Sequence, residues 1–206
     1  SIKNTEYLLQ KDCKLIVVAC NTATTNAIKI LRKKYAIPFI GIEPAIKPAA
    51  IQTKTNNIGI LATKGALNSA LFEKTTNTIT KKITTIETIG KGLVELIENG
   101  KINSSEMNEL LSSYITPMLE EDIDCLVLGC THYPYLIPQI REITGEKIQI
   151  IDSGEAVAKQ TKAILEKYNL LNSSQQSVNY SFFTNGSTGV MANLMNLEKR
   201  TIKKLD

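Results

Sequence analysis

The chain has 206 residues, of which 43% are hydrophobic and 21% charged, and its formal net charge is +4. This composition is ordinary for globular proteins and excludes a disordered or collagen-like chain, while the small basic clusters at 32–34 and 199–204 do not favour nucleic-acid binding. No apolar run approaches the ~20 residues that span a bilayer, and residues 1–4 lack the order of a signal peptide, so we expect a cytoplasmic protein without a membrane partner.

Short apolar segments alternate with longer segments of helical period, which is typical of an α/β fold with a mostly parallel sheet. In chain order, the pattern predicts strand 14–19, helix 24–34, strands 38–42 and 58–62, helix 67–76, strand 83–86, helices 91–99 and 105–120, strand 125–129, helix 135–143, strand 148–151, helix 154–168 and strand 178–184. Strands 14–19 and 125–129 contain the continuous apolar runs 15–19 and 126–129, which predict helices on both faces of each strand. No linker separates two halves, so a second domain must be interleaved with the first.

Two of the four cysteines follow predicted strands in similar surroundings. An apolar strand, a small residue, a cysteine and polar residues occur in this order around Cys20 and again around Cys130. The carboxyl ends of strands form the binding crevice in open α/β sheets. A helix N-terminus beside such a thiol lowers its pKa, so we expect both thiols to be partly ionised.

Two thiols on opposite walls of a cleft suit the inversion of a stereocentre, because one removes a proton while the other delivers one to the opposite face. General acid–base transfer is most efficient when the pKa of the group lies near the working pH. The arrangement needs neither a metal nor pyridoxal, so no cofactor is expected. His132 is the only histidine and follows Cys130 by two residues, which makes it a further candidate.

Structural and metal-binding interpretations of the cysteines compete with this one. Cysteine is among the most buried residue types, so Cys13 and Cys125 are predicted to be core or near-core residues, and the residues alone leave a core role open for Cys20 and Cys130. A zinc site is the sharpest chemical alternative, but the spacings 13–20 and 125–130 differ from those of zinc knuckles. The sequence has neither a Cys-x-x-Cys pair nor a glycine-rich phosphate loop.

The residues around both cysteines resemble the two motifs of bacterial glutamate racemases. Residues 18–24, with Cys-Asn-Thr, resemble the first motif, and residues 128–134, with Gly-Cys-Thr-His-Tyr-Pro, resemble the second. The second motif is the more specific one and argues against the related aspartate racemases. Further matches at 41–44, 61–65 and 151–154 extend the resemblance over most of the chain. The resemblance implies an isomerase that interconverts L- and D-glutamate and supplies D-glutamate for peptidoglycan.

For single residues, the resemblance implies that Cys20 acts on the α-proton of D-glutamate and Cys130 on that of L-glutamate, with His132 assisting Cys130. Glu98 matches an acidic position with a supporting role, although an exposed carboxylate at a helix end is an equally good interpretation. The implied substrate-binding residues are Asn21, Thr22, Thr63 and Thr131.

The resemblance also implies two interleaved, pseudo-symmetric α/β domains with the active site in the cleft between them. Residues 1–43 plus 153–206 would form the first, N-terminally incomplete domain, and residues 44–152 the second. The chain would cross near Glu43-Pro44, where proline ends a strand, and near Asp152. Cys20 and Cys130 would then face each other from different domains. Similar enzymes differ in oligomeric state, so the resemblance allows a homodimer but does not require one.

The chain departs from the family pattern in two places. Similar proteins carry Asp-Ser-Gly and Pro-Tyr-Gly motifs before Cys-Asn-Thr, and neither precedes Cys20 here. We therefore expect that the chain lacks about one βαβ unit and is inactive or nearly so alone. Ala66 replaces a common threonine, which predicts the loss of one substrate hydrogen bond, worth ~0.5–1.5 kcal/mol. The alternatives are a racemase for aspartate or a related amino acid, and a non-catalytic carboxylate-binding fragment.

Overall fold

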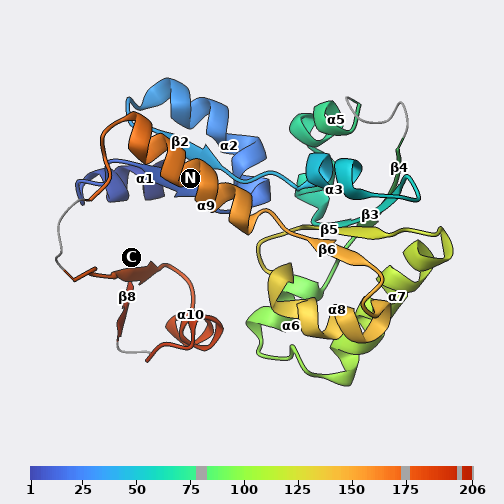
Figure 1. Ribbon diagram of the computed structural model, residues 1–206. Coiled ribbons are helices and arrows are strands. Elements are labelled where there is room, and N and C mark those ends of the chain that lie inside the picture. Colours follow the sequence, from blue (N-terminus) through green and yellow to red (C-terminus); the bar gives the residue numbers. More distant parts are fainter. Residues whose placement is uncertain (78–82, 173–176, 199–200, 206) are drawn as a thin grey trace.

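In a computed structural model, the structure describes residues 1–77, 83–172, 177–198 and 201–205. Within this part of the chain, every pair of neighbouring strands is parallel, and the strands lie in three sheets with helices packed around them (Figure 1). The fold is therefore α/β with parallel sheets, as the alternating segments predict. No helix in the described ranges combines the length and the apolar character needed to cross a membrane.

The observed elements agree with most of the predicted segments. The strands are β1 (Ile16–Val18), β2 (Phe39–Gly41), β3 (Asn57–Ala62), β4 (Thr84–Ile89), β5 (Cys125–Gly129), β6 (Gln149–Ile151), β7 (Phe182–Thr184) and β8 (Ile202–Lys204). The helices are α1 (Ile2–Leu9), α2 (Asn21–Lys34), α3 (Ile46–Gln52), α4 (Lys64–Leu67), α5 (Ala70–Asn77), α6 (Leu93–Glu98), α7 (Ser105–Glu120), the 3-10 helix η1 (Tyr133–Leu136), α8 (Ile137–Thr144), α9 (Gly154–Lys167) and α10 (Thr188–Met195).

The largest sheet has the strand order β4-β3-β5-β6 and carries an apolar core on each face. One core packs between the sheet and α6, α7 and α8, and the other between the sheet and α3 and α4 (Figure 1). All five residues of β5 are buried, which confirms the helices expected on both faces of this strand. This double cover makes the carboxyl end of β5 a rigid position.

The two-stranded sheet β1–β2 is less well covered. Its core consists of Ile16, Ile28, Leu31 and Phe39 and lies against α2. Val17 of β1 is 36% exposed, so the expectation that both faces of this strand are covered is wrong. The physical reason is that Val17 points to the opposite face of the strand from Ile16 and Val18, and the apolar core of the described residues lies on the face of those two residues.

The chain passes twice between these two sheets, and the two passages touch. After β2 it enters α3, and after β6 it returns to α9 (Figure 1). At this point the hydroxyl of Ser153 donates a hydrogen bond to the backbone carbonyl of Glu43. Ser153 is 6% exposed, so the two passages are held together by a shielded polar contact.

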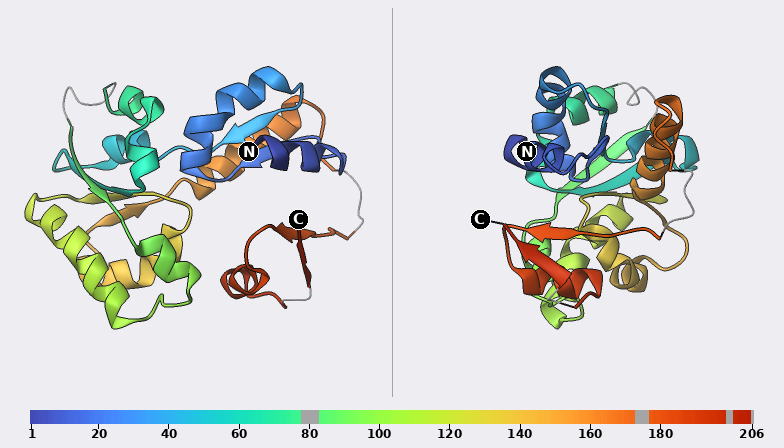
Figure 2. Two further views of the ribbon diagram at one scale, coloured as in Figure 1. Left: turned by 180° about the vertical axis from the view of Figure 1, so that it is seen from behind. Right: turned by 90° about the vertical axis from the view of Figure 1, so that its left-hand side faces the viewer.

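The C-terminal segment forms the third sheet, β7–β8, together with α10. Figure 2 shows that this segment lies apart from the β1–β2 sheet, below α1 and α9. The ring of Phe183 meets the ring of Tyr7 on α1 edge to face, with centroids 5.3 Å apart. This contact joins the two ends of the described chain.

Five short elements were not predicted, namely α1, α3, α4, α10 and β8. Each has too few residues to display a clear hydrophobic period. Isolated helices of this length are marginal in water, and packing supplies their stability. In α3, for example, Ile46 and Ala49 are both 0% exposed although Pro48 lies between them.

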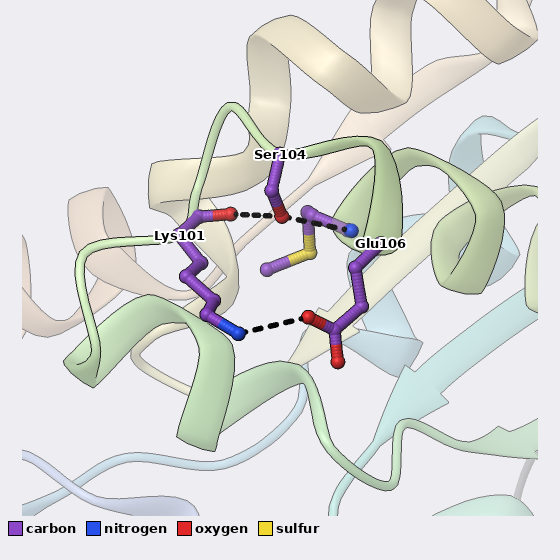
Figure 3. A network of polar contacts seen from close by, with 4 residues as sticks. Lys101, Ser104 and Glu106 are labelled. Carbon is purple, nitrogen blue, oxygen red and sulfur yellow. Dashed lines mark hydrogen bonds and ion pairs between the residues drawn. The ribbon is translucent and has the colours of Figure 1, made fainter.

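Helix α7 begins where the sequence predicts, at a polar cap. The Ser104 hydroxyl accepts a hydrogen bond from the N–H of Met107 at 3.2 Å and donates one to the Lys101 carbonyl at 2.8 Å (Figure 3). Such a cap contributes about 1 kcal/mol, whereas the exposed Lys101–Glu106 ion pair, at 3.0 Å, contributes less. The capped helix supports the core beneath β5.

Candidate active site

Cys20 lies where β1 passes into α2 and is the N-cap residue of that helix. Its backbone is extended, with φ −150° and ψ 123°, and its Sγ accepts a hydrogen bond from the backbone N–H of Ala23 at 3.5 Å. The side chain is exposed. The predicted position, between a strand end and a helix N-terminus, is therefore observed, and a core role for this cysteine is not.

The two polar residues after Cys20 open α2. Asn21 is 3% exposed, and its Nδ2 has no hydrogen-bond partner among the described residues. Thr22 contacts Thr63, with the two hydroxyl oxygens 2.9 Å apart. Because Thr63 follows β3 directly, this contact joins the carboxyl ends of β1 and β3. Three of the predicted binding residues therefore lie near Cys20, and one of them presents an unpaired buried donor.

Cys130 lies directly after β5 and is 8% exposed. Burial raises the pKa of its thiol, while the backbone N–H groups of His132 and Tyr133 act in the opposite direction and the neighbouring Cys20 adds to the rise. The expectation of a lowered pKa is therefore wrong for Cys130, because removal from water outweighs the helix-end N–H groups.

His132 connects the Cys130 thiol to Glu98. The Cys130 Sγ lies 3.9 Å from His132 Nδ1, and His132 Nε2 lies 3.1 Å from an Oε1 oxygen of Glu98. A neutral His132 with its proton on Nε2 donates to Glu98 and presents the Nδ1 lone pair to the thiol. Glu98 is half-exposed at the end of α6, so it is both a helix-end carboxylate and the outer member of this chain of contacts.

Two hollows meet at Thr131. A cavity of about 230 Å³ is lined by Asn21, Cys130, Thr131 and Asp152, among others. A second hollow of about 690 Å³ is lined by Thr131, by His132 and Glu98, and by apolar side chains of α10. The first therefore brings residues that follow β1, residues of β5 and the β6–α9 connection around one thiol. A further hollow of about 590 Å³ lies between β2 and α9, away from both thiols.

Ala66 does not face either of these hollows. It is 0% exposed and packs in the core beside α3, and its N–H donates to the Thr63 hydroxyl at 3.3 Å. The expected loss of a substrate hydrogen bond at this position therefore has no support in the geometry. The N–H of Ala66 instead fixes the hydroxyl of Thr63 as the cap of α4.

The other two cysteines, Cys13 and Cys125, line neither of the two hollows that meet at Thr131. Cys125 is 1% exposed, and burial together with the neighbouring Asp124 raises its pKa to about 11. Cys13 is partly buried before β1. Across the described ranges, no group of three or more His, Cys, Asp or Glu side chains is arranged to hold a metal ion.

Reasoning from sequence missed some residues that shape the site. Asp152 and Ser153 line the smaller cavity beside Cys130. Tyr133 is fully buried directly after His132, and its hydroxyl donates to the carbonyl of Gly90 at 3.0 Å. The motifs at 128–134 and 151–154 contain three of these residues, but a motif gives no information about which side chain faces a cavity or a distant backbone group.

The fold and the site define a class of α/β protein. Its strands are parallel, and in each of two sheets a cysteine follows a strand. A model of the family described as Asp/Glu/hydantoin racemase matches residues 2–161, and the chain belongs to this family of isomerases. Glutamate racemases are prominent among its relatives. The glutamate racemase of Herpetosiphon aurantiacus is 38% identical over 190 residues, covering 92% of this chain and 75% of the relative. That of Ralstonia pickettii is 45% identical over 154 residues, covering 75% and 55%.

Solved structures give the same result for the fold. Glutamate racemase isoform RacE1 from Bacillus anthracis has a TM-score of 0.85 at 30% identity, covering 100% of this chain and 78% of the other. The Escherichia coli enzyme, solved with L-glutamate and the activator UDP-MurNAc-Ala, has a TM-score of 0.78 at 30% identity, covering 93% and 74%. An aspartate racemase from Picrophilus torridus, with a TM-score of 0.53 at 24% identity, shares the fold. The chain thus spans between about half and four fifths of these relatives.

Proposed function

We propose that this protein is a glutamate racemase, which interconverts L- and D-glutamate by proton transfer between two thiols and so supplies D-glutamate for peptidoglycan. The observation that carries the proposal is the pair of thiols at the ends of β1 and β5, of which Cys130 is backed by His132 and Glu98. The similarity to glutamate racemases over most of the chain supports glutamate as the substrate.

In this mechanism each thiol serves one face of the α-carbon. Cys130 removes the α-proton of L-glutamate as a thiolate, while Cys20 delivers a proton to the opposite face, and the roles reverse for D-glutamate. Because burial raises the pKa of Cys130, its thiol needs a proton acceptor nearby in order to become a thiolate. His132 supplies one through Nδ1, and the carboxylate of Glu98 stabilises the imidazolium that forms.

Polar groups at the same strand ends hold the substrate. The unpaired Nδ2 of Asn21 is a donor for a carboxylate oxygen, and a buried donor without a partner is costly until a ligand satisfies it. The hydroxyls of Thr22 and Thr63 and the residue Thr131 provide further hydrogen-bonding groups for the amino and carboxylate groups of glutamate.

We propose further that residues 1–43 plus 153–206 form one α/β domain and residues 44–152 another, pseudo-symmetric to it, with the active site between them. Separate apolar cores on the two sides support this division. The hydrogen bond from Ser153 to Glu43 supports crossings at these two points. Cys20 and Cys130 would then approach the substrate from different domains.

Two other functions remain as competing outcomes. A racemase for aspartate or a related amino acid would use the same two thiols, and the smaller cavity of about 230 Å³ is lined by groups that suit any amino-acid carboxylate. A carboxylate-binding protein without catalysis would use Asn21 and the threonines alone.

One experiment separates the three functions. The protein, supplied with the Asp-Ser-Gly and Pro-Tyr-Gly segment that similar proteins carry before Cys-Asn-Thr, is incubated in deuterium oxide with glutamate or aspartate. Deuterium at the α-carbon is followed by NMR, and circular dichroism follows the ratio of the two enantiomers. Exchange and racemisation with glutamate alone support the proposal. Exchange with aspartate instead supports the second function, and binding of glutamate without exchange supports the third; either result overturns the proposal.

A further inference from the structure

Gly90 connects the two loops that carry residues of the candidate active site. It follows β4 and is buried. Its backbone N–H donates to the carbonyl of Ala62 at 2.9 Å, directly before Thr63. Its own carbonyl accepts the hydrogen bond from the Tyr133 hydroxyl at 3.0 Å, directly after His132. One residue therefore ties the loop after β3 to the loop after β5.

The contact between Gly90 and Tyr133 leaves no room for adjustment. A Cβ atom at Gly90 would lie 2.4 Å from the Tyr133 hydroxyl oxygen and 2.8 Å from Leu93 Cδ1. Tyr133 is 0% exposed within the core below β5. Burial, followed by the nearby Cys130, raises the pKa of its hydroxyl, which therefore stays protonated and remains a donor. The buried ring of Tyr133 thus holds its hydroxyl in one position, where it donates to the backbone carbonyl of Gly90.

Tyr133 also closes the turn that begins at Cys130. Its N–H donates to the Cys130 carbonyl at 3.1 Å. The backbone N–H groups of His132 and Tyr133 counteract the effect of burial on the pKa of the Cys130 thiol. The position of these N–H groups relative to the sulfur is therefore set by a turn whose far end is anchored at Gly90.

We propose that Tyr133 is a positioning residue for Cys130: through its hydroxyl bond to Gly90 it holds the 130–133 turn so that the backbone N–H groups and His132 stay aligned with the Cys130 sulfur. Its consequence for catalysis rests on the proposed function, but its consequence for the thiol does not. The titratable groups around Cys130 are Cys20, His132 and Tyr133, with Asp152 lining the same cavity.

The test measures the ionisation of Cys130 directly. Each protein is alkylated with iodoacetamide across a range of pH, and the Cys130 adduct is quantified by peptide mass spectrometry. In Tyr133→Phe we expect the midpoint of Cys130 alkylation to rise by roughly 0.5–1 pH unit, because misaligned N–H groups stabilise the thiolate less. We expect kcat for racemisation to fall roughly ten-fold with KM nearly unchanged, since a displaced acid–base group acts less efficiently.

The matched control is Tyr35→Phe, which removes a tyrosine hydroxyl that donates to Glu6 at 2.8 Å, away from both thiols. It should keep the parent midpoint and kcat. If Tyr133→Phe does not fold, Gly90→Ala tests the same contact, because its Cβ displaces the hydroxyl, and the same upward shift is expected.

The outcomes separate the inference from the proposed function. The inference is overturned if the midpoint of Cys130 alkylation in Tyr133→Phe, or in Gly90→Ala when that variant is used, equals that of the unsubstituted protein. This holds even if the protein racemises glutamate. An upward shift in a protein that racemises no amino acid supports the positioning role and overturns the proposed function. An upward shift together with a reduced kcat supports both.

Discussion

Replacing Gly129 with alanine is expected to disturb both candidate loops through one methyl group. Gly129 lies opposite Ala62 in the parallel register of β5 and β3. A Cβ atom at Gly129 would lie 2.5 Å from the Cβ of Ala62 and 3.4 Å from its Cα. Non-bonded carbon atoms lie about 3.5–4.0 Å apart. The two strands must therefore separate by about 1 Å, because neither methyl group can rotate away.

The size of the effect follows from the packing around these strands. Overfilling a well-packed core costs about 1–3 kcal/mol. At about 2–4 °C per kcal/mol for a chain of this size, Tm should fall by roughly 2–12 °C. Cys130 follows Gly129 and Thr63 follows Ala62, so the same separation moves a candidate catalytic residue relative to a candidate binding residue. A displacement of about 1 Å lowers the rate by up to ~10²-fold.

Thermal unfolding and racemisation, both followed by circular dichroism, measure the two effects in one sample. The control is Gly189→Ala in α10, where the nearest atom to a new Cβ is the Ser187 hydroxyl at 3.6 Å. Alanine is favoured over glycine inside a helix by roughly 0.5–1 kcal/mol, so this variant should keep or raise Tm. A Gly129→Ala protein with the parent Tm and kcat would refute the argument from strand spacing.

Three further predictions concern single side chains. In a protein that also carries the N-terminal Asp-Ser-Gly and Pro-Tyr-Gly segment, Cys20→Ser and Cys130→Ser should each abolish racemisation, because inversion needs an acid and a base on opposite faces; turnover in either variant would contradict the two-thiol mechanism. Glu98→Gln should lower kcat roughly ten-fold, less than the ~10²–10⁴ of a direct acid–base group, and unchanged initial rates would remove Glu98 from the mechanism. Burial opposes ionisation of Asp124, yet hydrogen bonds from Thr53, Lys54 and Thr55 lower its pKa overall. Asp124→Asn should therefore cost about 1–2 kcal/mol at neutral pH, and the difference in urea unfolding should shrink as the pH falls below about 4, where protonation removes the same stabilisation; a constant difference would contradict this.

The sequence alone predicted the features that depend on local pattern. Residues 125–129 form a fully buried strand because every residue in the run is apolar, and α7 begins at Ser105 because the hydroxyl of Ser104 caps its first turn. The two Cys motifs predicted the positions of Cys20 and Cys130 after strands. These features could be predicted because hydrophobic period and capping chemistry act over a few neighbouring residues.

Only the tertiary structure decided what surrounds each thiol. The net rise in the pKa of Cys130 results from burial beneath elements distant in sequence, and the contact of His132 with Glu98 joins residues 34 positions apart. The anchoring of Tyr133 at Gly90 spans 43 positions. Desolvation and hydrogen bonding depend on which segments the fold brings together. A pattern of neighbouring residues does not say which distant segments these are. The sequence thus determined where the two thiols lie along the chain, and the packing determined how Cys130 is buried, partnered and held.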